Sequence, residues 1–337
     1  MNESYSEAGS LESTPLVMPY KDRSTGLMVF GILTVLLGCL AGLFVPLMLF
    51  GQVMAATTTK VPTNFAAIVP ALVMYAGLSV ALVWLGIGSI MARRWARALL
   101  LIFSWSWLGL GLFDLIATAF ILPKALANLP STAPAGNPAM NASIMEGVMV
   151  VTFVMLGVVF VILPAIWTFF YNSRHVKATC DARDLVPRWT DACPLPVLGL
   201  CSWLMFSAMM LLTMPVIGFG VAPFFGMFLT GAPGVLLYLA LSALWAYAAW
   251  LLYRLDLRGW WLILITVCVY TLSSILTFAR HDIIEMYRLM NYPEAQIEQI
   301  QKSGLLAGNS MLWMMLFFLV PFLGYLLFIK KYLRRNP

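Results

Sequence analysis

Long apolar segments separated by short clusters of charged residues form the main pattern along this chain. Asp, Glu, Lys and Arg are absent from six long blocks: 24–59, 61–92, 147–173, 192–253, 259–279 and 303–329. A helix that crosses the roughly 30 Å hydrocarbon layer needs about 20 apolar residues at about 1.5 Å rise each. The blocks and the apolar stretch after Arg94 therefore predict eight transmembrane helices. They cover approximately residues 26–53, 66–91, 97–121, 146–171, 196–219, 233–253, 259–279 and 308–329.

Composition supports an all-α integral membrane protein. Hydrophobic residues make up 62% of the chain and charged residues 10%, against roughly 45–50% and about 25% in an average soluble domain. Transmembrane strands read as short alternating segments in closed barrels, which does not fit apolar runs of this length. We therefore expect a multi-pass helical protein of the cell membrane, inner or plasma.

Three short motifs recur in the same order and indicate two tandem copies of a four-helix unit. The motifs begin at Pro46 and Pro215, at Tyr75 and Tyr238, and at Phe160 and Phe317, with separations of 169, 163 and 157 residues. Each copy has an even number of spans, so both copies have the same orientation and are expected to superpose by a rotation of about 180° around the membrane normal. Prolines within or near the spans are expected to kink them at equivalent points; these are Pro46, Pro164, Pro215 and Pro321.

The predicted organisation follows from the repeat. Residues 1–25 form a polar tail, 26–171 the first repeat, 172–195 a linker, 196–329 the second repeat and 330–337 a basic tail. In repeat two, residues 280–302 are expected to form an amphipathic helical cap, because Ile283, Ile284 and Tyr287 can share one helix face. The corresponding segment of repeat one, 123–145, is rich in Pro, Ala, Asn and Ser and is predicted to be an irregular loop.

Charge asymmetry predicts the orientation. If both termini lie on one side, that side carries 15 of the 20 Lys and Arg residues and the other side carries five. The positive-inside rule then places both termini in the cytoplasm. The net charge of +6 fits attraction to anionic lipids at the inner leaflet and gives no support to nucleic-acid binding. The first apolar run is too long for a cleaved signal peptide, so we expect it to remain as the first span.

The linker 172–195 could be a plain polar connection, or it could have one of two further roles. His175, Cys180 and Cys193, with Asp181 as a possible fourth ligand, could bind a metal ion. Structural zinc sites usually contain ligand pairs two to four residues apart, and the linker lacks such a pair, so no metal site is assigned. Docking of a cytoplasmic partner is the second possibility.

Four ionisable residues are candidates for a site between the repeats on the side away from the termini. Asp114 in the third span and Arg280 after the seventh could form an ion pair across the repeats, and Glu146 and His281 lie at similar depth. Ionisable groups at membrane depth are functional candidates by default. The alternatives are an ion pair that only holds the repeats together, solvated unpaired charges, or a binding or transport site beneath the cap.

The absence of polar groups through the middle of nearly every span favours a non-enzymatic protein that binds lipid-like molecules or a membrane-protein partner. A secondary transporter is the alternative, because transporters contain repeats and interrupted helices; it predicts that the four prolines line one cavity. An intramembrane enzyme is the third possibility and requires Asp114, Glu146 and His281 to converge. We expect no cofactor, since the only two histidines lie outside the apolar cores and cannot hold a haem there.

Overall fold

The computed structural model describes residues 20–59, 65–127, 138–217, 220–294, 297–298, 301 and 310–333. Within these residues, eight helical segments are long and apolar enough to cross a membrane, as the sequence predicts. They are Ser24–Met54, Ile68–Ile90, Arg94–Ala119, Glu146–Asn172, Leu195–Val216, Ala232–Tyr253, Leu257–Phe278 and Met315–Tyr332. The chain is therefore a multi-pass helical membrane protein, and its described residues include a small β-hairpin.

The first half of the molecule contains four of these spans. Its elements are α1 (Ser24–Thr59), α2 (Phe65–Ile90), α3 (Arg94–Ala127), α4 (Pro138–Leu156), the π-helical segment η1 (Gly157–Ile162) and α5 (Leu163–Asn172). A connector follows, with helix α6 (Arg174–Arg183) and the short 3-10 helix η2 (Trp189–Asp191). The fourth span is thus a single helical run in which six residues have π geometry.

The second half contains the other four spans. Its elements are α7 (Leu195–Ile217), strands β1 (Ala222–Phe224) and β2 (Met227–Leu229), α8 (Ala232–Tyr253), α9 (Leu257–Phe278), α10 (Ile283–Leu289), α12 (Ser310–Ile329) and the 3-10 helix η3 (Lys330–Tyr332). The strands pair in antiparallel register, with Ala222 opposite Leu229 and Phe224 opposite Met227. The hairpin packs on α9 and α8.

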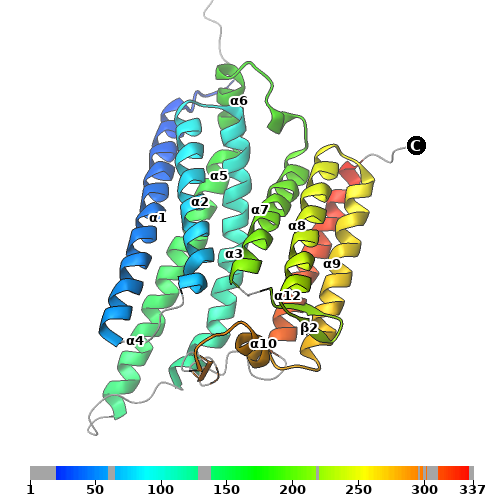
Figure 1. The fold of residues 1–337 in the computed structure, drawn as a ribbon. Helices are drawn as coiled ribbons and strands as arrows, with labels where there is room; N and C mark the ends of the chain where they lie inside the picture. The colour runs from blue at the N-terminus through cyan, green and yellow to red at the C-terminus, as the bar shows by residue number, and fades with distance from the viewer. Residues whose placement is uncertain are drawn as a thin grey trace, which may run out of the picture.

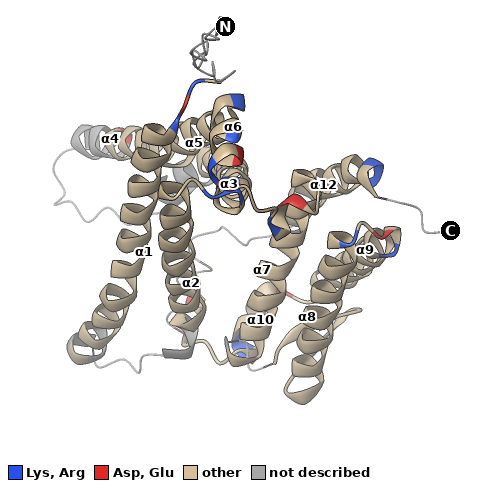
Figure 2. Ribbon diagram, turned by 90° about the horizontal axis from the view of Figure 1, so that it is seen from above, with Lys and Arg blue, Asp and Glu red and all other residues tan. Residues whose placement is uncertain are grey.

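The spans lie side by side and give the molecule two distinct ends (Figure 1). We call the end with α6 and η3 the termini face, and the end with the β-hairpin and α10 the hairpin face. Charged residues gather around α6 and the neighbouring helix ends and at α10, whereas α1, α2 and α8 carry none along their length (Figure 2). This distribution is what a bilayer around the middle of the bundle requires.

Glycines allow α1 and α2 to pack at close range. A Cβ atom on Gly31 would lie 2.8 Å from the carbonyl oxygen of Gly86, and one on Gly86 would lie 2.7 Å from that of Gly31. Gly38 is similarly close to the backbone nitrogen of Val83, at 2.9 Å. Because lipid tails are as apolar as the side chains, helices in a membrane associate largely through such backbone proximity. The first two spans therefore form a tight helical hairpin.

The turns between α2 and α3 and between α8 and α9 have the same local structure. Each contains a non-glycine residue with positive φ, Ala92 at 52° and Leu255 at 60°. The Ala92 amide donates to the Ser89 carbonyl and the Leu255 amide to the Leu252 carbonyl, both at 2.8 Å. In each turn the next amide donates to the carbonyl one residue earlier in the helix. The two halves thus reverse direction in the same way.

The structure differs from the sequence prediction at two places on the hairpin face. The segment 123–145, predicted to be a loop, is helical up to Ala127 and again from Pro138. Alanine and leucine favour the helical continuation of α3, and proline is well suited to the first helical position of α4. The β-hairpin is an element that the hydrophobic pattern did not predict, because strands of three residues show no periodicity.

The segment predicted to form the cap contains the short helix α10. α10 buries Ile283 and Ile284 in a small cluster with Ile297, and Phe278 and Tyr287 pack against it. Of the segment predicted to form the cap, residues 295–296, 299–300 and 302 lie outside the described residues. α10 therefore packs apolar side chains against the end of α9, and the amphipathic cap over 280–302 remains a prediction.

Candidate functional site

A large apolar cleft lies between the two halves of the bundle. Its walls are α3 from the first half and α7, α9 and α12 from the second, with Trp245 of α8. The cleft has a volume of about 1290 Å³, above the roughly 300–1,000 Å³ of typical small-molecule pockets. No lining residue in this described region is charged. The cleft is thus large enough for a lipid and chemically similar to the bilayer interior.

The cleft extends along the helix axes. On α12 its lining runs from Met315 to Phe328, and on α3 from Ile102 to Ile116. At about 1.5 Å per residue these stretches span about 20 Å, more than the roughly 15 Å of one hydrocarbon leaflet. A chain the length of one leaflet therefore fits within it.

Contacts between the halves close parts of the cleft wall. The Trp203 indole of α7 donates to the Ser106 hydroxyl of α3 at 2.7 Å. Nearer the hairpin face, the ring centroids of Phe113 and Phe318 are 4.2 Å apart. One hydrogen bond and an aromatic contact thus connect α3 to the second half along the cleft.

Hydroxyl groups provide the few polar positions of the lining. Ser207 of α7 and Thr271 of α9 line the cleft, and neither makes a hydrogen bond among the described residues. Tyr325 of α12 also lines it and donates to the Pro196 carbonyl at 2.8 Å, near the termini face. The lining therefore suits a neutral chain and has no group that would neutralise an ion.

Two adjacent lysines at the termini face differ in their position relative to the cleft. The Lys331 ammonium lies 4.0 Å from the ring centroid of Phe328, a lining residue, and 5.0 Å from that of Tyr332. The Lys330 ammonium lies 4.7 Å from the centroid of Trp260, which is buried in the core of the second half and is not a lining residue. Within the described part of the chain neither lysine forms an ion pair. Lys331 thus places an available positive charge at the mouth of the cleft on the termini face.

The ionisable residues singled out from the sequence lie on the hairpin face and do not line the cleft. Asp114 of α3, beside the lining residue Phe113, and Glu146 at the start of the fourth span both have exposed side chains. The ion pairs between described residues include none that joins Asp114 to Arg280. The proposed pairing remains a prediction.

Arg280 and His281 instead contact the turn of the β-hairpin. His281 places Nδ1 2.8 Å from Glu285 Oε2 and Nε2 3.2 Å from the Gly226 carbonyl oxygen. A Cβ atom on Gly226 would lie 2.7 Å from Arg280 Nη1, and the φ of Gly226 is +91°, which favours glycine. The Gly226 amide donates to the Thr277 hydroxyl at 3.0 Å. These groups therefore fasten the hairpin to the end of α9.

The four prolines singled out from the sequence occupy different environments. Pro321 lines the cleft, whereas Pro46, Pro164 and Pro215 do not. Pro46 is exposed on α1, Pro164 follows the π-helical segment at the start of α5, and Pro215 lies inside α7. The four residues thus do not all line this cleft, and the kinks expected at them remain a prediction.

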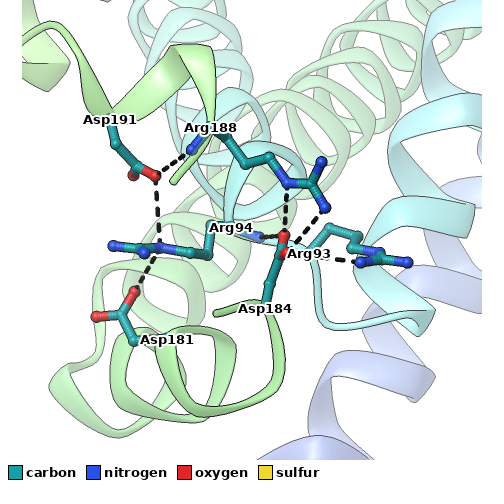
Figure 3. Close-up of polar contacts among 6 residues, drawn as sticks. All are labelled: Arg93, Arg94, Asp181, Asp184, Arg188 and Asp191. Carbon is teal, nitrogen blue, oxygen red and sulfur yellow. Dashed lines mark hydrogen bonds and ion pairs between the residues drawn. The ribbon is translucent and has the colours of Figure 1, made fainter. Parts of the chain in front are cut away.

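The connector is fixed to the first half by an ion-pair network centred on Asp184 (Figure 3). The Asp184 carboxylate accepts hydrogen bonds from Arg188 Nη2 at 2.9 Å and Nε at 3.2 Å. It also lies 3.5 Å from Arg93 Nη1 and accepts from the Arg94 backbone amide at 3.3 Å. These interactions, above all the hydrogen bond from Arg188, lower the pKa of Asp184.

A second part of the network surrounds the Arg94 side chain. Arg94 Nε lies 3.0 Å from Asp181 Oδ1 and 3.5 Å from Asp191 Oδ2 (Figure 3). On the other side of the connector, the Tyr253 hydroxyl of α8 donates to the Trp189 carbonyl at 2.8 Å. The connector thus contacts the α2–α3 turn and the end of α8. This network has no signal in the sequence, because its partners in the α2–α3 turn and in the connector lie about 90 residues apart.

The linker residues considered as metal ligands are engaged elsewhere. His175 Nδ1 accepts from the Lys21 backbone amide at 3.3 Å. Cys180 and Cys193 are buried free cysteines, and burial raises the pKa of each thiol to about 11, which disfavours the thiolate that binds metal. Among the described residues, no group of three or more His, Cys, Asp or Glu side chains could hold a metal ion.

Comparison with known proteins gave no relative: no protein-family model, curated protein or solved structure shows a significant match to this chain.

Proposed function

We propose that this multi-pass membrane protein binds a lipid-like molecule in the cleft between its two halves. The observation that carries the proposal is the combination of a lipid-sized volume with a lining that has no charged side chain. Transporters of hydrophilic solutes usually place polar groups and freed backbone at the midplane, where they replace the water of the solute. Here the lining offers only scattered hydroxyl groups and tryptophan indole N–H groups, such as the buried Trp245 Nε1, which favours an apolar ligand.

The termini face is, in this proposal, the cytoplasmic side. Fifteen of the 20 Lys and Arg residues belong to segments on that side, which the positive-inside rule assigns to the cytoplasm. Reporter fusions at Lys60 and at Gly231 are then expected to report an extracytoplasmic position, and a fusion at Asp184 a cytoplasmic one. The opposite result at Asp184 would reverse the orientation.

We also propose that the two halves derive from a tandem duplication. The turn residues Ala92 and Leu255 are 163 residues apart, the same separation as Tyr75 and Tyr238. Their matching positive φ angles and hydrogen bonds support equivalence of the second and third spans with the sixth and seventh. A duplicated bundle provides a reason for a cleft between the halves, since ligand sites in such proteins commonly lie at the repeat interface.

A secondary transporter remains the alternative. The position of Pro321 in the cleft lining favours it, while the positions of the other three prolines do not. An intramembrane enzyme receives no support from the described contacts, because no hydrogen bond or ion pair between described residues joins Asp114, Glu146 and His281. Of the three functions, lipid binding therefore requires the fewest functional groups that are missing from the described site.

The test is photolabelling of the protein in nanodiscs with a phospholipid that carries a diazirine on its acyl chain. We expect labelling of α3, α7 and α12 peptides to saturate at a low fraction of labelled lipid, unlike the labelling of the exposed α1 surface. Gly109→Trp fills the cleft, because Gly109 lines it and a Cβ there meets nothing within 4 Å. It should abolish the saturable component.

Gly77→Trp is the matched control for this experiment. Gly77 lies in α2, away from the cleft lining, and a Cβ there also meets nothing within 4 Å. It should leave the saturable labelling unchanged. Labelling of the cleft peptides that rises in proportion to probe, as on α1, or that persists in Gly109→Trp, would refute the proposal.

A further inference from the structure

We infer that the ligand of the cleft is an anionic phospholipid whose phosphate lies beside Lys331 at the termini face and whose acyl chains extend along the cleft toward the hairpin face. The inference rests on the proposed lipid-binding function and names the class of lipid and its orientation. It is based on the charged residues that lie around the uncharged lining of the cleft.

The uncharged lining places any ionic head group at a mouth of the cleft. An ionised group within the hydrocarbon layer is costly unless it is paired or hydrated, and no lining residue provides a counter-charge. A phosphate would therefore remain at one end, where water and side chains from the membrane surface can reach it, while the chains occupy the apolar interior.

The charged residues next to the lining differ in sign at its two ends. Lys331 contacts the lining residue Phe328 at the termini face, and Asp114 directly follows the lining residue Phe113 at the other end. An anion is attracted to the first mouth and repelled from the second. Arg280, the predicted partner of Asp114 on the hairpin face, contacts the hairpin turn at Gly226 and is not a lining residue. The charge distribution thus favours the head group at the termini face.

The Lys331 ammonium is available for such a contact. It packs on the faces of Phe328 and Tyr332 and has no carboxylate within 4.0 Å among the described residues. A lysine ammonium has three hydrogen-bond donors. An aromatic face contacts the ammonium on one side only and leaves N–H donors on the other side without a partner. The remaining donors can bind phosphate oxygens.

The dimensions agree with this orientation. From the level of Phe328 the lining continues for about 20 Å toward Met315, which exceeds the roughly 15 Å depth of one leaflet. A phospholipid of the leaflet on the termini face would therefore keep its phosphate at the normal depth and place its chains in the cleft without leaving that leaflet.

The experiment compares binding of phosphatidylglycerol and of phosphatidylcholine with identical acyl chains. Each lipid carries the diazirine and is titrated into nanodiscs that contain wild type, Lys331→Gln or Lys330→Gln, and the saturable labelling of cleft peptides is measured. Lys330 is the matched control, because it provides the same charge one residue away but packs on Trp260 instead of a lining residue. We expect Lys331→Gln to weaken phosphatidylglycerol binding about fivefold, the factor expected for one basic residue at a membrane surface. Lys330→Gln and phosphatidylcholine binding should change little.

The outcomes separate this inference from the proposed function. Equal binding of both lipids with saturable labelling intact would overturn the inference and leave the function in place. Equal weakening by both lysine variants would assign the effect to general surface charge and would also overturn it. A preference that responds to Arg280→Gln but not to Lys331→Gln would place the head group on the hairpin face, against the inference. Absence of saturable labelling with either lipid would refute both proposals.

Discussion

Asp184 accepts two hydrogen bonds from the guanidinium group of Arg188, four residues later, while only 2% of its own side chain is exposed. Arg93 approaches the same carboxylate from the α2–α3 turn. Hydrogen bonds that involve charged groups contribute more than neutral ones, and loss of one partner leaves the other without compensation. This carboxylate is therefore expected to dominate the attachment of the connector.

Replacement of Asp184 by alanine is expected to lower the free energy of unfolding by about 1–3 kcal/mol. The matched control is Glu294→Ala, whose carboxylate is 71% exposed and 3.5 Å from Arg288; exposed pairs of this kind contribute about 0–1 kcal/mol. Thermal unfolding of the purified variants in one detergent measures the difference. Equal effects of the two substitutions would show that Asp184 does not anchor the connector.

The stability of the protein should also decrease at low pH, because the Asp184 carboxylate becomes protonated there. The pKa of Asp184 is lowered in the folded protein, chiefly by the hydrogen bond from Arg188. The folded state then holds its proton less tightly than the unfolded state, so the contribution is complete above the unfolded pKa of about 3.9. It is lost as the pH falls from about 4 through the folded pKa. Unfolding measured between pH 6 and pH 3 should show a smaller decrease in Asp184→Asn than in wild type, and identical slopes would contradict this assignment.

A third prediction concerns the close contact of the first two spans. Gly31→Leu should disrupt the packing of α1 on α2, because its Cβ would lie 2.8 Å from the backbone carbonyl of Gly86. Gly51→Leu on the same helix is the control, since a Cβ there meets nothing within 4 Å. Size-exclusion chromatography after a heating series should show earlier aggregation for Gly31→Leu only. A wild-type profile for this variant would contradict the proximity.

The hairpin attachment can be tested with two threonines of α9. Both hydroxyls donate to the carbonyl four residues earlier, Thr277 at 2.9 Å and Thr266 at 2.7 Å, but only Thr277 also accepts from the Gly226 amide. Loss of one net hydrogen bond of about 1 kcal/mol should accelerate hydrogen exchange of the Gly226 amide about fivefold in Thr277→Val. Thr266→Val should not change the rate. Equal protection of Gly226 in both variants would exclude the bond as its source.

The spans and the first cap helix were predictable from the sequence because their signals are local. A charge-free run of sufficient length determines a span almost alone, and the spacing of Ile283, Ile284 and Tyr287 is sufficient to indicate the buried face of α10. The hairpin around Gly226 lacks such a signal, since its strands are three residues long and the amides of its turn donate to hydroxyl groups of α9 about 50 residues later.

The cleft and the connector network could not be predicted for a related reason. Phe113 and Phe318 are ordinary apolar residues in their own helices, and only the packing of the two halves makes them neighbours across the cleft. In the same way, Arg93 and Asp184 each resemble an ordinary charged residue at a membrane surface. Their partnership depends on the path of the connector over the α2–α3 turn.

The attachment of the connector has a mechanical consequence for the bundle. It is held to the α2–α3 turn by several charged contacts, but its described side-chain hydrogen bond to α8 is the single one from the Tyr253 hydroxyl to the Trp189 carbonyl. If the halves tilt apart at the termini face, the connector moves with the first half, and the Tyr253 bond is the one that breaks. Separation of the halves at the termini face would therefore break one neutral hydrogen bond of the connector, that of Tyr253, and leave the ion pairs of the connector intact.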